Sequence, residues 1–190
     1  EAWKANPDLV SKFYNQRRKQ IIESAPNEAH YAIAEMQKLA DVRIITQNID
    51  DLHERAGSEK VMHLHGNIRY SKSSGPNQEK EYYLIPGASL TKNDTCPEGF
   101  RLRPHVVWFG EAVPMMEKAI EMILEATHFV VIGSSLQVYP AANLLGYCPA
   151  NAKKWIIDPK ANEMDNPYEF TLINQKAVEG INTLVKQLKL

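Results

Sequence analysis

The chain has 190 residues, of which 44% are hydrophobic and 24% are charged, so it can bury the core of one soluble domain, or of one domain with an insert. Its 22 basic and 23 acidic residues nearly cancel, and its longest basic run is Arg17-Arg18-Lys19. No apolar run approaches the roughly 18 to 20 residues that cross a bilayer. The sequence therefore argues against nucleic acids and membranes as partners.

The two cysteines indicate a reducing compartment. Cys96 and Cys148 are far apart and fit neither a disulfide framework nor a Cys-rich zinc site. No signal peptide opens the chain, so a cytoplasmic protein is expected. Because the first residue is Glu1 rather than Met and lies just ahead of a predicted helix, the chain is expected to be a fragment.

The first part of the chain alternates helices with short apolar strands. Asn6 followed by Pro7 predicts the N-cap and first residue of a helix over 7–24. The next expected elements are a helix over 27–39 and buried strands over 42–46 and 61–64. Residues 66–104 break this alternation, because turn-forming residues flank a single expected strand at 82–85. We interpret this segment as a loop-rich insert.

Beyond the insert the alternation resumes. The expected elements are, in order, a strand at 106–109, a helix at 114–126, a strand at 129–132, a helix at 140–145, a strand at 154–157 and a helix at 176–188. Short apolar strands separated by helices of this length are typical of an α/β fold. We therefore predict a Rossmann-like parallel sheet with helices on both faces, plus a smaller domain formed by a helical module and the insert.

Polar residues follow three of the expected strands, at the edge where such a sheet binds its ligand. These runs are 46–53, 63–66 and 133–136. Gly133, Ser134 and Ser135 have small side chains, and a phosphate could approach their backbone N–H groups closely. A tight strand-to-helix turn without any ligand explains the same residues equally well.

His65 lies at the end of the second expected strand, next to Gly66. An imidazole titrates near neutral pH and can act as a general base. Two other interpretations remain open. The ring could be hydrogen-bonded in the core, or it could form half of a metal site with His63, which strand alternation places on the same face.

The apolar stripe of the first helix contains a charge. The apolar members of the stripe are Val10, Phe13, Tyr14 and Ile21. A step of about 100° per residue places Arg17 in the middle of them and Arg18 beside them, in solvent. A buried guanidinium needs an internal carboxylate or an anionic ligand, and the Tyr14 hydroxyl, one turn earlier, could bind the same anion. Helix geometry alone favours a structural ion pair.

Four motifs follow one another along the chain. They are Thr46-Gln47-Asn48-Ile49-Asp50 with Leu52-His53 and Ala56-Gly57, then Leu64-His65-Gly66, then Arg103-Pro104-His105-Val106-Val107-Trp108-Phe109-Gly110-Glu111, and finally Gly133-Ser134-Ser135-Leu136-Gln137-Val138-Tyr139-Pro140-Ala141-Ala142. In order and spacing they resemble the sirtuin family of bacterial type, the Sir2-like NAD-dependent protein deacylases. The segment from Phe13 to Arg18 resembles the tyrosine-x-x-arginine signature of sirtuins that remove succinyl, malonyl or glutaryl groups. The resemblance covers essentially the whole chain.

The resemblance implies a division of the chain. The small domain would consist of a helical module over 1–30 and the insert over 66–104. The Rossmann-like NAD-binding domain would consist of 31–65 and 105–190. NAD and the acylated lysine of a protein substrate would meet in the cleft between the two domains.

The resemblance also implies the site residues. His65 would be the catalytic base, and Asn48 would also be catalytic. The nicotinamide side of NAD would be held by Gln47, Asn48, Ile49 and Asp50. The adenosine side would be held by Gly133, Ser134, Ser135, Asp158 and Ala177, with Asp158 standing where the family usually has Asn. The acyl-lysine tunnel would be lined by Val107, Trp108, Phe109 and Gly110.

The same resemblance implies that Tyr14 and Arg17 bind a carboxylate at the end of the acyl group. An arginine can hold a carboxylate through two parallel hydrogen bonds, so this interpretation is preferred over the ion pair. The expected reaction is deacetylation, desuccinylation or demalonylation, with free lysine, nicotinamide and O-acyl-ADP-ribose as products. Two alternative functions remain. An NAD glycohydrolase or ADP-ribosyltransferase would use the same NAD pocket but would need no acyl-lysine tunnel. A non-catalytic NAD or ADP-ribose-binding module would tolerate loss of His65.

Two departures from the family pattern qualify this expectation. Family members usually carry two Cys-x-x-Cys pairs in the insert, whereas Gly99 stands where the partner of Cys96 would be. We therefore expect no zinc, and instead a small apolar core made by Tyr82, Tyr83, Leu84 and Phe100. The family's N-terminal Gly-Ala-Gly strand and phosphate loop should precede residue 1, so this chain alone is expected to be inactive.

Overall fold

The computed structural model describes residues 2–134, 136, 138–164, 166 and 168–189. The chain divides into two compact units. Unit 1 consists of Glu1–Ala25, Asn48–Leu52 and His65–Ala112. Unit 2 consists of Pro26–Gln47, His53–Leu64 and Val113–Leu190. Residues 48–52, 65 and 105–112 thus belong to the same unit as the insert, and residues 26–30 belong to unit 2. The predicted domain boundaries stay a prediction.

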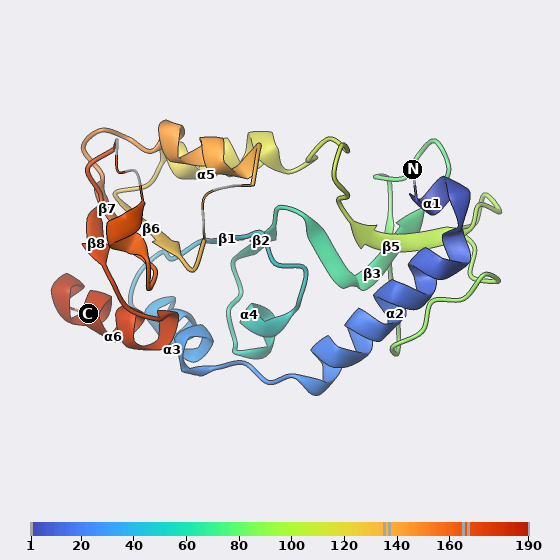
Figure 1. Ribbon diagram of the computed structural model, residues 1–190, viewed down its shortest axis with the longest axis horizontal. Coiled ribbons are helices and arrows are strands. Elements are labelled where there is room, and N and C mark those ends of the chain that lie inside the picture. The colour runs from blue at the N-terminus through green and yellow to red at the C-terminus, as the bar shows by residue number, and fades with distance from the viewer. Residues whose placement is uncertain (1, 135, 137, 165, 167, 190) are drawn as a thin grey trace. The chain divides into compact units, whose positions relative to one another are not determined.

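Unit 1 combines a helix with an antiparallel sheet. Its elements are α1 (Ala2–Ala5), α2 (Pro7–Glu23), β3 (Gly66–Ser73), β4 (Tyr82–Leu84) and β5 (Leu102–Val106). The Asn6 side chain accepts a hydrogen bond from the Leu9 backbone N–H, and Pro7 opens the helix, which confirms the predicted start of α2. The strand order is β4-β3-β5, and α2 packs against β3 and β5 (Figure 1).

Two predictions for this part of the chain were wrong, one in the insert and one just beyond it. Residues 71–73 continue β3 instead of forming a loop, because their side chains are buried and partnered; the Ser71 hydroxyl, for example, donates to the Tyr83 carbonyl. The strand expected at 106–109 lies earlier, over Leu102–Val106, and contains Pro104. β5 is an edge strand that pairs only with β3, and an edge strand tolerates a residue without an N–H group.

The apolar core of unit 1 is small. It contains Ile85, Leu90, Cys96 and Leu102, with Tyr83 packed against it. Of the four residues predicted to form this core, only Tyr83 does so, because alternation along β4 turns Tyr82 and Leu84 outward, and Phe100 is also exposed. Tyr82 instead stacks on the His105 ring.

Unit 2 contains the predicted parallel strands. Its elements are α3 (Glu28–Met36), β1 (Ile44–Thr46), most of α4 (Leu52–Arg55), β2 (Val61–His63), α5 (Met116–Leu124), β6 (His128–Ile132), the 3-10 helix η1 (Ala141–Tyr147), β7 (Lys153–Ile157), the 3-10 turn η2 (Ala161–Glu163), β8 (Thr171–Ile173) and α6 (Ala177–Leu188). β1 pairs in parallel with β2, and β6, β7 and β8 form a second parallel group. β8 was not predicted, and the helix expected at 140–145 is a 3-10 helix.

Helices cover both faces of the β6-β7-β8 group. On β7, Trp155 and Ile157 belong to the cluster that includes residues of α3 and α6, whereas Ile156 points into a cluster on the opposite face. On β6, Val130 packs against the cluster with α3 and α6, and Phe129 packs against the cluster on the opposite face. Phe129 also packs against the cluster of α5 and η1. This alternation produces the layered α/β arrangement expected from the sequence (Figure 1).

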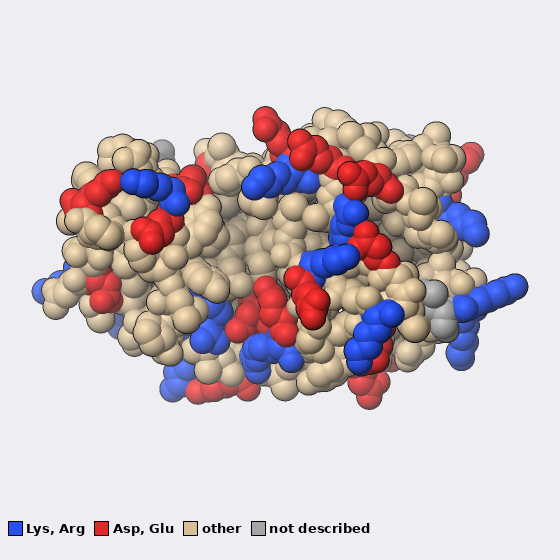
Figure 2. Space-filling view, turned by 180° about the vertical axis from the view of Figure 1, so that it is seen from behind, with Lys and Arg blue, Asp and Glu red and all other residues tan. Residues whose placement is uncertain are grey.

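The surface carries both signs of charge. On the face shown in Figure 2, acidic and basic side chains lie interspersed. None of the helices in the described part of the chain has the length and apolar character needed to cross a membrane.

Candidate active site

The carboxyl ends of β1 and β2 lie side by side. The strands are parallel, with Thr46 opposite His63, and the Thr46 carbonyl accepts a hydrogen bond from the Leu64 N–H at 2.9 Å. Gln47 follows β1 directly and is partly buried. The chain leaves unit 2 at both of these points, towards Asn48 and towards His65.

Within unit 1, Asn48, Ile49 and Asp50 belong to a segment that is hydrogen-bonded to β3, the strand that follows His65. The Ile49 carbonyl accepts from the Ile68 N–H at 2.8 Å, and the His65 carbonyl accepts from the Val107 N–H at 2.9 Å. The Asp50 carboxylate accepts from the Leu52 N–H at 3.1 Å, which fixes its orientation at the start of α4. Backbone hydrogen bonds therefore bring the predicted base, the nicotinamide segment and the first tunnel residue into one unit.

Gly66 makes the His65 turn possible. Its φ of +83° lies in the left-handed region, and a Cβ at this position would overlap the His105 carbonyl oxygen. Only glycine accepts both the backbone conformation and this close approach of β5. The glycine next to the predicted base is therefore a requirement of the local backbone.

The predicted substrate segment, residues 107–110, is a turn beyond the end of β5. The Trp108 carbonyl accepts from the Glu111 N–H at 3.0 Å, and Gly110 has a φ of +85°. Val107 and Trp108 are half-buried, whereas the Phe109 side chain is 98% exposed. The segment is therefore a turn with an exposed aromatic ring instead of the expected strand.

A buried ion pair holds this turn. Arg103, 5% exposed, donates from Nη1 to Glu111 Oε1 at 2.7 Å and from Nη2 to Glu111 Oε2 at 2.9 Å. Glu111 Oε2 also accepts from the Trp108 N–H at 2.9 Å. Burial alone would raise the pKa of Glu111, but the hydrogen bonds from Arg103 and Trp108 outweigh it, so the pKa lies below its usual value. Both residues belong to the motif at 103–111, but their pairing was not predicted from the sequence.

Tyr14 reaches this turn from α2. The Trp108 indole Nε1–H donates to the Tyr14 hydroxyl oxygen at 2.9 Å, and the two rings lie 6.2 Å apart. Burial raises the pKa of Tyr14, although the Trp108 hydrogen bond opposes the shift. Tyr14 therefore keeps its phenolic proton at neutral pH.

The two neighbouring arginines of α2 have the reverse of their predicted burial. Arg18 is fully buried, and it donates to the Ile68 carbonyl at 2.6 Å, the Asn15 side chain at 2.8 Å and the Ala88 carbonyl at 2.9 Å. Burial, followed by the charge of Arg69, lowers the pKa of Arg18 to about 10. The stripe prediction was wrong because the buried face of α2 centres on Ser11 and Arg18, where backbone carbonyls accept hydrogen bonds from Nε and Nη1 of the guanidinium.

Arg17 is exposed instead. Its guanidinium lies 5.4 Å above the Phe13 ring, and its Nη1 is 3.5 Å from Gln20 Oε1. Phe13 is itself 50% exposed. Among the described residues Arg17 forms no ion pair, so the structural ion pair considered from the sequence is not found there.

The residues expected on the adenosine side belong to unit 2. β6 and β7 are parallel neighbours, with Ile132 opposite Ile157, so Gly133 and Asp158 follow adjacent strand ends. Gly133 has a φ of +60°, and a Cβ there would meet nothing within 4 Å. Asp158 Oδ1 accepts from the Lys160 N–H at 2.8 Å. Open space beside a glycine and a carboxylate fits a nucleotide ribose and phosphate.

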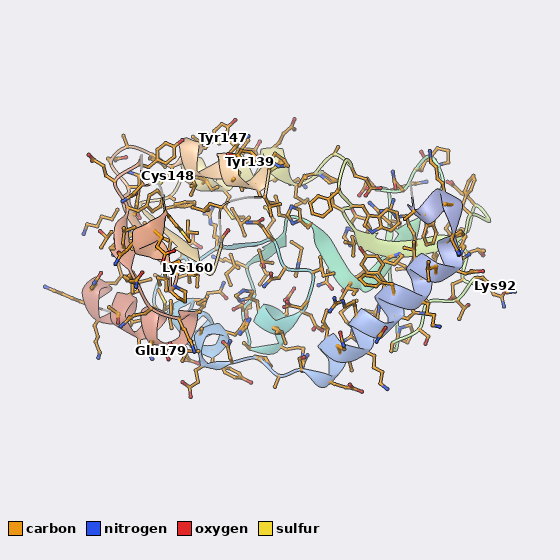
Figure 3. All side chains as sticks on the ribbon, in the orientation of Figure 1. Lys92, Tyr139, Tyr147, Cys148, Lys160 and Glu179 are labelled. Carbon is orange, nitrogen blue, oxygen red and sulfur yellow. The ribbon has the colours of Figure 1, made fainter. Side chains whose placement is uncertain are left out.

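Three further predicted positions flank this edge. The Ser134 hydroxyl oxygen accepts from the Leu136 N–H at 3.3 Å, and Ser135 lies outside the described residues. Ala177 begins α6 and packs against the apolar core of unit 2. Lys160 lies in the turn after β7, and Glu179 lies in the first turn of α6 (Figure 3).

His63 has a carboxylate partner. Its Nε2 lies 2.6 Å from Glu54 Oε1. Burial would raise the pKa of Glu54, but the hydrogen bond to His63, a backbone hydrogen bond and the charges of His63 and His53 together outweigh burial, so the pKa is lowered. Among the residues that the structure describes, no group of three or more His, Cys, Asp or Glu side chains is placed to bind a metal. The expected absence of zinc from the insert stays a prediction.

A family model described as the Sir2 family matches residues 1–140. The chain belongs to the Sir2 family. A curated relative from Helicobacter pylori, named "NAD-dependent protein deacylase", is 45% identical over 188 residues, which are 98% of this chain and 80% of the relative. A solved Sir2 homologue in complex with NAD is 34% identical, with a TM-score of 0.83, over 99% of this chain and 74% of that one. A Sir2 structure bound to an acetylated peptide is 27% identical, with a TM-score of 0.79, over 99% and 81%. The predicted family and fold class are confirmed.

Proposed function

We propose that this chain is an NAD-dependent protein-lysine deacylase that accepts acyl groups ending in a carboxylate. The deacylase activity follows from membership of the Sir2 family and from a curated deacylase relative at 45% identity. Its cosubstrate is NAD, and its partners are acylated lysine side chains of proteins. The observation that carries the acyl preference is the exposed Arg17 guanidinium, which has no ion pair among the described residues and stands one helical turn from Tyr14.

In this proposal His65 is the general base. NAD, when bound, would supply the ribose carbon from which nicotinamide leaves as the acyl oxygen attacks, and the ribose hydroxyl that finally carries the acyl group as free lysine is released. His65 takes the proton of that hydroxyl, and its backbone position is fixed by the Val107 N–H and by Gly66.

Two groups of residues are proposed to bind NAD. Asn48 is proposed to act in catalysis and, with Gln47, Ile49 and Asp50, to confine nicotinamide. The adenosine side is assigned to the strand-end residues of unit 2, namely Gly133, Ser134, Ser135, Asp158 and Ala177. The space beside Gly133 and the Asp158 carboxylate support this assignment.

The substrate is proposed to bind along residues 107–110, which line the acyl-lysine tunnel. Phe109 and Gly110 are exposed, and their backbone is proposed to pair with a peptide. At the far end of the acyl group, Arg17 and Tyr14 provide a cation and a hydroxyl for a carboxylate. The two free cysteines, Cys96 and Cys148, fit action in the reducing cytoplasm.

The acyl preference predicts the effect of Arg17→Met. Charge-assisted hydrogen bonds contribute about 1.5 to 3 kcal/mol, so kcat/KM on a succinyl-lysine peptide should fall about 10- to 150-fold. The loss on the matched acetyl-lysine peptide should be far smaller. Mass spectrometry of both peptides incubated with NAD and the full-length protein measures the two rates.

Two controls define this experiment. Lys19→Met removes another exposed cation from the same helix and should leave both rates unchanged. His65→Ala should abolish turnover of both peptides while NAD binding is retained. Equal losses on both peptides in Arg17→Met would return Arg17 to a structural role. Turnover retained by His65→Ala, or ADP-ribose released without any peptide, would contradict the deacylase mechanism.

A further inference from the structure

A hydrogen bond joins two residues that are 94 positions apart. The Trp108 indole Nε1–H donates to the Tyr14 hydroxyl at 2.9 Å. Within the described part of the chain, this is the one hydrogen bond of the Tyr14 hydroxyl. The contact links the predicted substrate turn to the helix that carries Arg17.

The chemistry of the two groups fixes the direction of this bond. An indole N–H is only a donor, so the Tyr14 oxygen must be the acceptor. The phenolic proton then cannot point at Trp108 and must be directed elsewhere. Because burial keeps the Tyr14 hydroxyl protonated, the group presents a hydrogen-bond donor on its other side. A donor near Arg17 is suited to a carboxylate and adds little to the binding of a methyl group.

The Trp108 ring is held on several sides. The Arg103 guanidinium lies 3.4 Å from the ring centroid, and the Trp3 ring lies 5.8 Å away. The Trp108 backbone N–H is bound by Glu111, which also forms the two-bonded ion pair with Arg103. A cation stacked on an indole restricts its rotation. The donor that meets Tyr14 is therefore fixed in place before any ligand binds.

We propose that Trp108 is a specificity-determining residue that orients the Tyr14 hydroxyl proton towards the carboxylate of an acidic acyl group. Arg103 and Glu111 are the positioning residues that hold its ring. This inference rests on the proposed function, because it assigns a role within the same acyl-binding site. It makes Trp108 a third residue that determines acyl selectivity, together with Tyr14 and Arg17.

A double-mutant cycle tests the proposal on the full-length protein. Trp108→Phe keeps an aromatic ring under Arg103 but removes the donor. One ordinary hydrogen bond corresponds to about three- to tenfold in rate, so the succinyl-to-acetyl ratio of kcat/KM should fall about three- to tenfold. In a Tyr14→Phe background the same change should leave the ratio unaltered, because no hydroxyl remains to be oriented. The loss should lie in KM more than in kcat.

The outcomes separate the inference from the proposed function. A ratio that Trp108→Phe leaves unchanged, or lowers equally with and without the Tyr14 hydroxyl, overturns the inference. If Trp108→Phe fails to fold, benzothienylalanine at position 108 replaces the indole N–H by sulfur at nearly constant shape and gives the same test. A wild-type protein that does not remove succinyl groups refutes the proposed preference instead.

A spectroscopic readout addresses the hydrogen bond without any turnover. The chain has three tryptophans, so the indole N–H resonance of Trp108 can be assigned from the Trp108→Phe spectrum. Tyr14→Phe should shift that resonance upfield and speed its exchange with solvent, whereas Arg17→Met should not. An indole resonance that is insensitive to Tyr14→Phe overturns the inference whatever the acyl preference of the enzyme.

Discussion

The interiors of the two units are built from different chemistry. The buried charged side chains of the described part of the chain, Arg18, Lys72 and Arg103, all belong to unit 1. Unit 2 instead buries three clusters of apolar side chains. Unit 1 therefore depends on hydrogen bonds with specific directions, and unit 2 on apolar area, which is non-directional and more tolerant of small changes.

Gly66→Ala and Gly180→Ala should show the largest contrast. At Gly66 the new Cβ meets the His105 carbonyl and requires a left-handed backbone, whereas at Gly180 it meets the side chains of Ile157 and Ile173. Overpacking of a core costs about 1 to 3 kcal/mol, and this range applies to Gly180→Ala. Gly66→Ala should cost more than about 3 kcal/mol, because backbone must move as well.

Denaturant unfolding combined with hydrogen exchange measures both glycine variants and locates the loss. Exchange in Gly66→Ala should rise first around the His65 turn and β5. Gly180→Ala should instead affect α6 and β7. Equal losses of stability in the two variants would show that a clash with backbone costs no more than a clash with side chains.

Glu111→Gln tests the ion pair of unit 1. Loss of one partner of a buried pair costs about 3 to 5 kcal/mol, but Glu111 retains 32% side-chain exposure, so we expect about 2 kcal/mol. Glu23→Gln removes a carboxylate of an exposed pair on α2 and should change the stability by less than about 0.5 kcal/mol. Equal effects of the two changes would show that burial does not distinguish the units.

The pH dependence of Glu111→Gln follows from its pKa. The folded-state pKa of Glu111 is lowered, so its contribution to stability is fully present above the unfolded value of about 4.3. This contribution is lost as the pH falls from there through the folded pKa. The stability difference between wild type and Glu111→Gln should thus be constant from pH 7 to about 5 and shrink in acid. A difference that grows on acidification would contradict the lowered pKa.

Gln187→Met should have the smallest effect. The Trp155 indole N–H in unit 2 donates to Gln187 Oε1 at 2.9 Å, at an exposed helix position. An ordinary hydrogen bond contributes about 1 kcal/mol or less at such a site, and methionine keeps the side-chain length. Thermal unfolding should show a small decrease in Tm. A loss as large as that of Glu111→Gln would mean that unit 2 also depends on directional contacts.

The same difference explains what could be predicted from the sequence. Except for α4, η2 and β8, which were not predicted, the helices and strands of unit 2 were predicted within a few residues, because apolar side chains at regular spacing form its core. In unit 1, Ser71 and Lys72 are buried in a strand although their composition is that of a loop. Arg18 can be buried because its guanidinium donates hydrogen bonds to the carbonyls of Ile68 and Ala88. The spacing of hydrophobic residues in a sequence does not indicate where a backbone carbonyl will lie.

For the candidate site too, one part could be predicted from the sequence and another part could not. The residues of the motifs were named from resemblance, and the structure arranges Asn48, Asp50 and His65 in one unit. Contacts between distant residues could not be read from the sequence. The pairing of Arg103 with Glu111 spans a strand and a turn, and the hydrogen bond from Trp108 to Tyr14 depends on how α2 packs on the sheet.

The burial of Arg18 has a consequence for redesign of the enzyme. Two backbone carbonyls from different segments hold this guanidinium and fix the rotation of α2 about its axis. Phe13 and Arg17, on the exposed side of the same helix, contribute little to that anchorage. A library that varies positions 13 and 17 while keeping Arg18 can therefore explore new acyl groups on a helix whose orientation stays constant.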